Sequence, residues 1–380
     1  MRMREWFRQG GRRRILAVAL PVVVLAAAAG TAVALTAGDD AKPCWKVPAA
    51  TAALAENHAA ATKALDPGDD LSRYKVMSGL LSKEHLHACD GQGAILGKVV
   101  LNASTGGAGT PHTLGQARVA YAAASALSEE SDPLPAGMSP YVARLLADYI
   151  VDVQRTWYGS PDRKDFFQPA GTYQESREWA GDFPNRQDAT AAFSFKSDLY
   201  DTDVFFERVI GRFAADPEAF AVLYDAYRAH FAYYLERLSS EGAVPRLRDD
   251  KYSTSKLGAD LDLGMDARSI GSLVQRRANA AHDGTIRDAA AFNRAVQKLS
   301  RGVFPAASKP VTSTPPMGDI TRRAAAGGAK PRAMALLDGR HQLYAVLEQW
   351  GKDRKISAGR IADLRVKIDD SFVNGMLEVR

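Results

Sequence analysis

Apolar residues recur every three to four positions along most of the chain after residue 45, which is the spacing of amphipathic helices. The pattern predicts helices over about 48–65, 70–88, 113–129, 140–157, 202–215, 217–239, 266–282, 286–302, 331–352 and 357–378. Segment 95–101 fits a short helix or a strand, and the sequence has no strand-rich region and no internal repeat. The fold class predicted is all-α.

Three predicted helices have the clearest buried faces. Helix 140–157 aligns Val142, Leu145, Leu146, Tyr149, Ile150 and Val153 on one stripe. Helices 202–215 and 217–239 are rich in aromatic and aliphatic residues, and we expect both at the centre of the core. The last helix spaces its apolar residues by three and four, at Ile361, Leu364, Ile368, Phe372, Met376 and Val379. This C-terminal hairpin must therefore pack on the main domain or on a partner.

The N-terminal segment 15–38 carries no charge, and a helix of about 20 apolar residues crosses a bilayer. Six arginines precede it, whereas Asp39 and Asp40 follow it. By the positive-inside rule, this order places the N-terminus in the cytoplasm and the rest of the chain outside. We predict a transmembrane signal anchor of a single-pass cell-membrane protein.

Two alternatives remain for this segment. Ala32-Val33-Ala34 has the small-x-small form of a signal-peptidase site, so the segment can be a cleaved secretory signal. Arg12-Arg13 followed by apolar residues loosely resembles a twin-arginine export signal, although Gly11 stands where that signal has serine or threonine.

The predicted domain organisation follows from these segments. It comprises a basic cytoplasmic tail at 1–14, the anchor at 15–38, an extracytoplasmic helical domain at 39–302, a flexible linker at 303–330 and the C-terminal helical hairpin at 331–380. The linker is predicted from its density of Pro, Ser, Thr and Gly, a composition that buries too little apolar surface to order a segment.

The net charge argues against a nucleic-acid partner. The tail 1–14 holds six of the 49 Lys and Arg residues and one of the 44 Asp and Glu residues, so it carries the whole net charge of +5. The remaining chain is balanced, whereas a nucleic-acid-binding domain needs a basic surface of its own. The tail would instead contact anionic lipid headgroups.

The two cysteines, Cys44 and Cys89, both follow the apolar segment. In an oxidising compartment such a pair normally forms a disulfide. The bond would close a loop of about 45 residues and stabilise the fold by about 3–4 kcal/mol.

The segment 157–185 breaks the helical pattern and is rich in aromatic residues. Large rings are typical of binding surfaces, which makes this segment a candidate binding loop. The residues concerned are Trp157, Tyr158, Phe166, Phe167, Tyr173 and Trp179. The alternative, which we favour, is a long loop that its own aromatic side chains pin to the core.

Three carboxylates in the same loop are candidate catalytic groups: Glu175, Glu178 and Asp182. A glycosidase needs one protonated and one ionised carboxyl group on either side of the scissile bond. Glu175 and Glu178 meet this requirement only on a helical turn that faces a cleft, and acids at this spacing are common on solvated helix faces.

Other motifs lack essential parts. His85, His87 and Cys89 do not share one helix face, so we predict no metal site. The acidic segment 260–266 resembles a calcium loop but has its glycine at the fifth position, and a helix N-terminus capped by Asp266 explains it better. The glycines at 106–109 lack the following Lys-Ser/Thr of a phosphate loop, so we expect no cofactor. His230 lies among aromatic residues and is predicted to be a core histidine.

These observations predict a membrane-anchored extracytoplasmic helical binding or scaffold protein. The abundance of Ala, Arg and Gly resembles proteins of high-GC bacteria, so we place it in a bacterial cell envelope, with a protein or a cell-wall component as partner. Two alternatives stay open. One is an envelope glycan hydrolase that uses Glu175 and Glu178, and the other is an exported effector or toxin.

Overall fold

The computed structural model describes residues 44–68, 73–106, 112–129, 132–156, 208–237, 257–300 and 340–379. These residues are mostly helical and form no strand, so the all-α prediction is confirmed. None of the helices in these ranges is long and apolar enough to span a bilayer. The predicted tail 1–14, anchor 15–38 and linker 303–330 lie outside the described residues.

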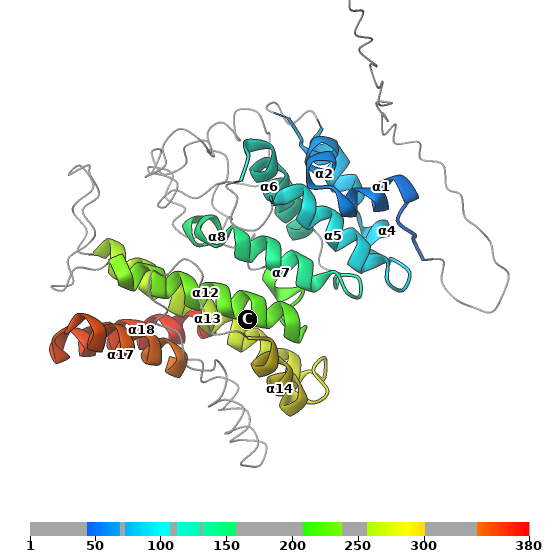
Figure 1. Cartoon of the computed structure of the whole chain (residues 1–380). Helices are drawn as coiled ribbons and strands as arrows, with labels where there is room; N and C mark the ends of the chain where they lie inside the picture. The colour runs from blue at the N-terminus through cyan, green and yellow to red at the C-terminus, as the bar shows by residue number, and fades with distance from the viewer. Residues whose placement is uncertain are drawn as a thin grey trace, which may run out of the picture. The chain divides into compact units, whose positions relative to one another are not determined.

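The helices follow one another along the chain as Figure 1 shows. They are α1 (Ala49–Ala53), the 3-10 helix η1 (Leu54–Glu56), α2 (His58–Leu65), α3 (Tyr74–Leu80), α4 (Lys83–Leu86), α5 (Gln92–Ser104), α6 (Leu114–Glu129), α7 (Ser139–Asp148), α8 (Ile150–Thr156), α12 (Pro217–Arg237), α13 (Leu257–His282), α14 (Ala289–Leu299), α17 (Arg340–Arg354) and α18 (Ala358–Glu378).

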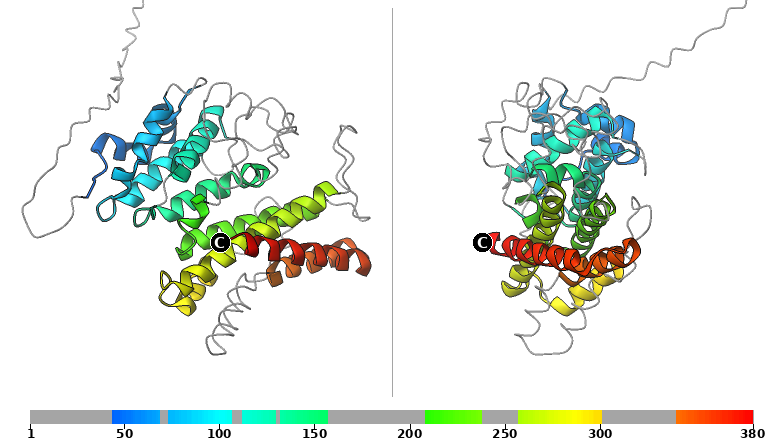
Figure 2. Two further views of the ribbon diagram at one scale, coloured as in Figure 1. Left: turned by 180° about the vertical axis from the view of Figure 1, so that it is seen from behind. Right: turned by 90° about the vertical axis from the view of Figure 1, so that its left-hand side faces the viewer.

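Two helices organise the packing. α5 contacts η1, α2, α6 and α7, whereas α12 contacts α7, α13, α14 and α17. α7 therefore lies between the N-terminal and the C-terminal helices (Figures 1 and 2). α12 can take this central place because Phe220, Leu223, Tyr227 and Phe231 are all fully buried. The core prediction for helix 217–239 is confirmed.

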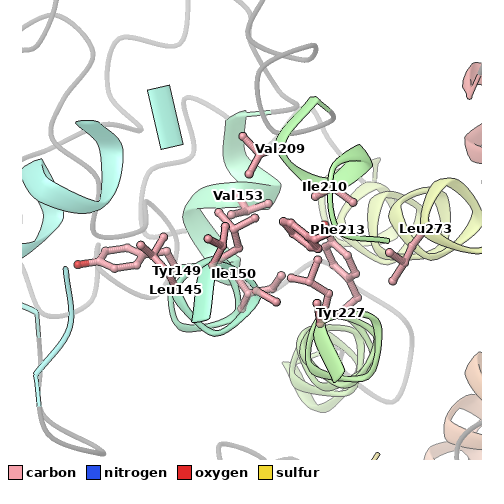
Figure 3. Close-up of a cluster of buried hydrophobic side chains, with 14 of the residues drawn as sticks. Leu145, Tyr149, Ile150, Val153, Val209, Ile210, Phe213, Tyr227 and Leu273 are labelled. Carbon is pink, nitrogen blue, oxygen red and sulfur yellow. The ribbon is translucent and has the colours of Figure 1, made fainter. Parts of the chain in front are cut away.

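The stripe predicted on helix 140–157 also faces the core. All six of its residues are buried. Figure 3 shows Val153 beside Val209, Ile210 and Phe213, whereas the ring of Tyr149 points away from them. The helix itself is interrupted, because Tyr149 leaves the helical conformation at φ −102° and ψ 31°. Its hydroxyl donates a 2.7 Å hydrogen bond to the carbonyl oxygen of Ser104, which ties the interruption to α5.

Other boundaries also differ from the sequence prediction, and segment 70–88 is divided into α3 and α4. Segment 48–65 is divided into α1, η1 and α2, because the side chain of Asn57 accepts a hydrogen bond from Ala60 N–H and starts a new helix. Segment 95–101 lies within α5, which settles the choice between helix and strand.

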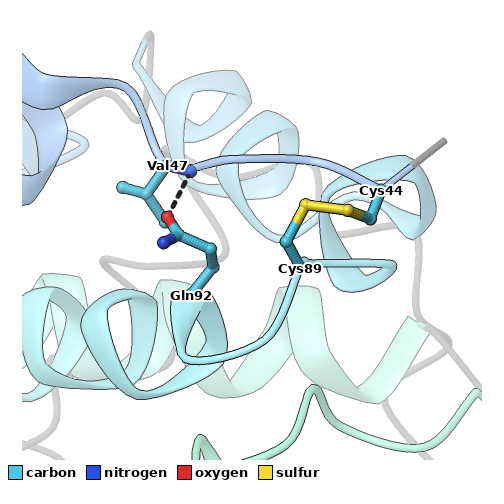
Figure 4. The surroundings of a disulfide bond; sticks show 4 residues. All are labelled: Cys44, Val47, Cys89 and Gln92. Carbon is cyan, nitrogen blue, oxygen red and sulfur yellow. Dashed lines mark hydrogen bonds between the residues drawn. A yellow bond between two sulfur atoms is a disulfide. The ribbon is translucent and has the colours of Figure 1, made fainter. Parts of the chain in front are cut away.

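The disulfide between Cys44 and Cys89 is confirmed, with the two Cα atoms 4.9 Å apart (Figure 4). Main-chain hydrogen bonds beside it join Trp45 N to His87 O at 3.0 Å and Cys89 N to Trp45 O at 2.9 Å. Next to them, the side chain of Gln92 accepts a 2.9 Å bond from Val47 N–H. The first described residues are therefore fastened to the start of α5 both covalently and by hydrogen bonds.

α13 packs against α18 with almost no space between the two backbones. A Cβ atom on Gly271 would lie 2.2 Å from the carbonyl oxygen of Phe372, and one on Gly375 would lie 1.9 Å from that of Arg268. Arg268 also donates a hydrogen bond of 2.6 Å to Glu378 beside this crossing. The C-terminal hairpin thus packs on the helices of the same chain, a point that the sequence left open.

The two arms of this hairpin lie side by side and are joined by a turn at 355–357 (Figure 2). Ser357 caps α18 by accepting a 3.2 Å hydrogen bond from Arg360 N–H. Across the arms, Asp369 pairs with Arg340, and Arg365 donates a 2.7 Å bond to Glu348. The predicted core face of α18 is confirmed at Leu364, Ile368 and Phe372, which are buried.

The α13–α18 crossing yields the first prediction. Changing Gly375→Ala should lower the free energy of unfolding by about 2 kcal/mol, because the new methyl group forces the helices apart. Gly359→Ala on the same helix is the matched control, since a Cβ atom there has nothing within 4 Å. It should raise stability by up to about 1 kcal/mol. Denaturant unfolding followed by circular dichroism measures both, and equal effects would contradict the close approach.

A second prediction concerns Asp66, which links α2 to α6. Its carboxylate accepts two 2.9 Å hydrogen bonds from Arg118 and one of 3.0 Å from Gly68 N–H. Burial raises the pKa of Asp66, but these bonds and the charge of Arg118 outweigh it, so the pKa lies below its ordinary value of 3.8. A carboxyl group with a lowered pKa stabilises the fold above its unfolded pKa and loses that contribution as the pH falls through its folded pKa.

Asp66→Asn should therefore reduce the free energy of unfolding at pH 7 by about 1–2 kcal/mol. The difference from the unchanged protein should shrink as the pH is lowered from 5 to below 3, where the wild-type carboxylate is itself protonated. Urea unfolding at three pH values measures this trend, and a difference independent of pH would refute it.

Candidate functional site

The candidate site residues named by the sequence lie outside the described part of the chain. This holds for the aromatic residues Trp157, Tyr158, Phe166, Phe167, Tyr173 and Trp179 and for the carboxylates Glu175, Glu178 and Asp182. Their roles in binding and catalysis stay predictions. The nearest described residues are those of α8, which ends at Thr156, directly before Trp157.

The structure instead brings together a polar cluster that the sequence did not indicate. His230 on α12 faces Asp266 on α13, with Nδ1 at 2.9 Å from each carboxylate oxygen. Gln154, in the last turn of α8, donates hydrogen bonds of 3.0 Å to Asp266 and 3.1 Å to Ser269. Three helices therefore meet at one carboxylate.

This cluster corrects the prediction for Asp266. We expected Asp266 to cap a helix that begins after a polar stretch at 241–265, but α13 begins at Leu257 and Asp266 lies inside it. The local sequence is polar, yet Leu263 and Asp266 are fully buried. Residues 260–266 are helical, which is not the conformation of a calcium loop. The core placement predicted for His230 is confirmed.

A histidine held by a carboxylate through Nδ1 has the arrangement of a general base, because the carboxylate fixes which ring nitrogen carries the proton. A general base must, however, reach the proton that it removes. The side chain of His230 is 3% exposed and that of Asp266 is 0% exposed. In this structure the pair is closed to a substrate, and we interpret it as a structural tie between α8, α12 and α13.

Two arginines on the helices of this cluster are also buried, Arg228 on α12 and Arg277 on α13. Burial lowers the pKa of Arg277 to about 9, an effect that Tyr224 partly opposes, so its guanidinium stays charged at neutral pH. It lies 4.5 Å from the centroid of the Phe220 ring, whose π-electrons favour the cation. Burial likewise lowers the pKa of Arg228, while Asp225, 3.3 Å away, opposes the shift.

The histidines near the disulfide have structural surroundings. Cys89 is bonded to Cys44, and the ring of His85 stacks on that of Trp45 with 4.2 Å between the centroids. Among the described residues, no three His, Cys, Asp or Glu side chains come close enough together to hold a metal ion.

The outer face of α18 is the most unusual surface in the described part of the chain. The described residues include five exposed large apolar side chains, and three of these lie on α18: Val366, Val373 and Leu377, at 60%, 38% and 72% exposure. Their spacing of seven and four residues puts them on one stripe. We call these three residues the α18 stripe. Ala362 continues it by one turn toward the N-terminus and is also exposed.

The charges beside the α18 stripe are acidic. Asp363 and Asp370 are exposed and border it. Arg365, by contrast, is turned to α17, where it bonds to Glu348 and lies 4.9 Å from the centroid of the Tyr344 ring. The spacing of the α18 stripe was present in the sequence. It was missed because the buried residues of the same helix form the more regular apolar pattern.

Comparison with known protein families, with curated proteins and with solved structures finds no match to this chain.

The His230–Asp266 tie yields the third prediction. Asp266→Ala should lower the free energy of unfolding by about 3–5 kcal/mol, because it leaves the donors of His230 and Gln154 buried without this acceptor. Adding His230→Leu should cost less than the sum of the two single changes, with a coupling of at least about 1 kcal/mol. A double-mutant cycle by denaturant unfolding measures this coupling. Additive costs would show that the two side chains do not act as a pair.

Proposed function

We propose that this chain is a membrane-anchored extracytoplasmic protein, a helical binding module of a bacterial cell envelope, and that it binds a partner protein through the α18 stripe.

 The single observation that carries the binding role is the exposure of Val366, Val373 and Leu377 on one helix face. A partner that covers them would remove apolar surface from water.

Two features support a location outside the cytoplasm. The tail 1–14 and the uncharged segment 15–38 have the order of charges expected of a signal anchor. The disulfide between Cys44 and Cys89 is typical of oxidising compartments. Cys44 lies six residues after the uncharged segment ends. Both features point to export of the domain that starts at Cys44.

The exposed stripe supports binding for an energetic reason. Single exposed apolar side chains are common on protein surfaces, but several on one face mark an interaction site. The opposite face of α18 is already buried against α13, so its apolar residues do not need the stripe to form the core. The fold therefore does not need apolar residues at the positions of the α18 stripe, and a binding role explains why they are there.

The two alternative functions receive no such support. The hydrolase reading depends on Glu175 and Glu178, which lie outside the described residues. The effector reading would gain from a C-terminal module separate from the rest of the chain, whereas α18 is packed tightly on α13.

The fourth prediction tests the binding role in cells. Replacing the α18 stripe by Val366→Gln, Val373→Gln and Leu377→Gln should reduce recovery of a co-purifying protein at least tenfold, equivalent to about 1.4 kcal/mol. Glutamine suits a helix, so the fold should be retained. Affinity capture of the tagged full-length protein from detergent-solubilised membranes, quantified by mass spectrometry, gives the measurement.

The matched control changes the other two large apolar residues that are exposed in the described part of the chain, as Val76→Gln with Leu299→Gln. It makes the same kind of substitution elsewhere and should leave recovery unchanged. Equal recovery with the stripe variant and with the control would remove the basis of the proposed function.

A further inference from the structure

We infer that the partner of the α18 stripe is an amphipathic helix that carries lysine or arginine beside its own apolar residues. This inference rests on the proposed function and adds the chemistry of the partner.

The shape of the stripe fits a helix. Val366 and Val373 are seven residues apart, while Ala362 and Leu377 lie four residues before and after them. Val366 and Val373 therefore take equivalent positions in successive heptads of a coiled coil, in which side chains of one helix fit between those of another. The seam position between them is held by Asp369, which pairs with Arg340. α18 has 21 residues and is about 31 Å long, so it can present this seam over two heptads.

The charges beside the stripe select a basic partner. Asp363 and Asp370 are exposed and, like the valines, seven residues apart. They occupy the flanking positions that form ion pairs between helices in a coiled coil. Other acids of α18 already have partners within the chain, since Asp369 pairs with Arg340 and Glu378 with Arg268. Lysine or arginine on the incoming helix would complement Asp363 and Asp370.

The same charges disfavour two other occupants. If a second copy of the chain paired antiparallel about the middle of the segment from Ala362 to Leu377, Asp370 of one copy would lie opposite Asp370 of the other. Like charges at facing positions destabilise such pairs. An anionic bilayer surface would likewise repel Asp363 and Asp370.

The test uses the full-length protein in detergent and two fluorescent synthetic peptides of 21 residues with the same leucine seam. One peptide has lysine at the flanking positions and glutamate on its far face, and the other has these charges exchanged. Fluorescence anisotropy should show that the lysine-flanked peptide binds at least tenfold more tightly. The difference in affinity between the two peptides should fall at high salt, because the flanking ion pairs are exposed to solvent.

Three variants identify the contacts. Asp363→Asn with Asp370→Asn should abolish the preference between the peptides, whereas Glu84→Gln with Asp90→Asn, which removes the same charge elsewhere, should not. The triple glutamine variant of the α18 stripe should bind neither peptide at the stripe. Any binding to the basic tail 1–14 persists in that variant and is subtracted.

The possible failures can be told apart. Equal binding of both peptides would overturn the basic partner and leave the stripe as a binding site. Binding of neither peptide, with a cellular partner that still depends on the stripe, would overturn the helical partner. A concentration-dependent dimer in sedimentation that the triple variant abolishes would identify a second copy as the occupant. Loss of stripe dependence in the capture experiment would instead refute the proposed function itself.

Discussion

The close approach of α13 and α18 at Gly271 and Gly375 is the contact on which the C-terminal half of the fold depends. Backbones can come this near only where neither residue has a side chain, since a Cβ atom on either would overlap a carbonyl oxygen of the other helix. The approach continues toward the N-terminus of α13, where a Cβ atom on Gly264 would lie 2.8 Å from Oγ of Ser371. It also fixes the rotation of α18, so that Leu364, Ile368 and Phe372 face inward and the α18 stripe faces outward.

The carboxylate of Asp266 complements this contact from the other side of α13. Burying a carboxylate costs free energy unless its oxygens are hydrogen-bonded, and here His230 and Gln154 supply the donors. Each donor comes from a different helix, so the cluster is satisfied only when α8, α12 and α13 are in register. Apolar packing at the same position would tolerate more than one register, which gives the buried polar cluster a role in specificity.

At the other end of the described chain, the disulfide and the neighbouring hydrogen bonds fasten the first residues to α5. In the chain-entropy model, a loop of 45 residues closed in this way contributes about 4 kcal/mol to stability. The proposed anchor would end only six residues earlier.

The sequence by itself determined the all-α class, the pairing of its two cysteines, the buried stripe of helix 140–157 and the core histidine, because each follows from local periodicity or from composition. Tertiary structure alone decided that Asp266 lies inside α13, that His230 is its partner 36 residues away, and that α18 packs on α13. It also decided which of the two apolar spacings on α18 is buried. The physical reason is that these outcomes depend on contacts between helices distant in sequence, and such contacts override what a polar or apolar segment would do alone.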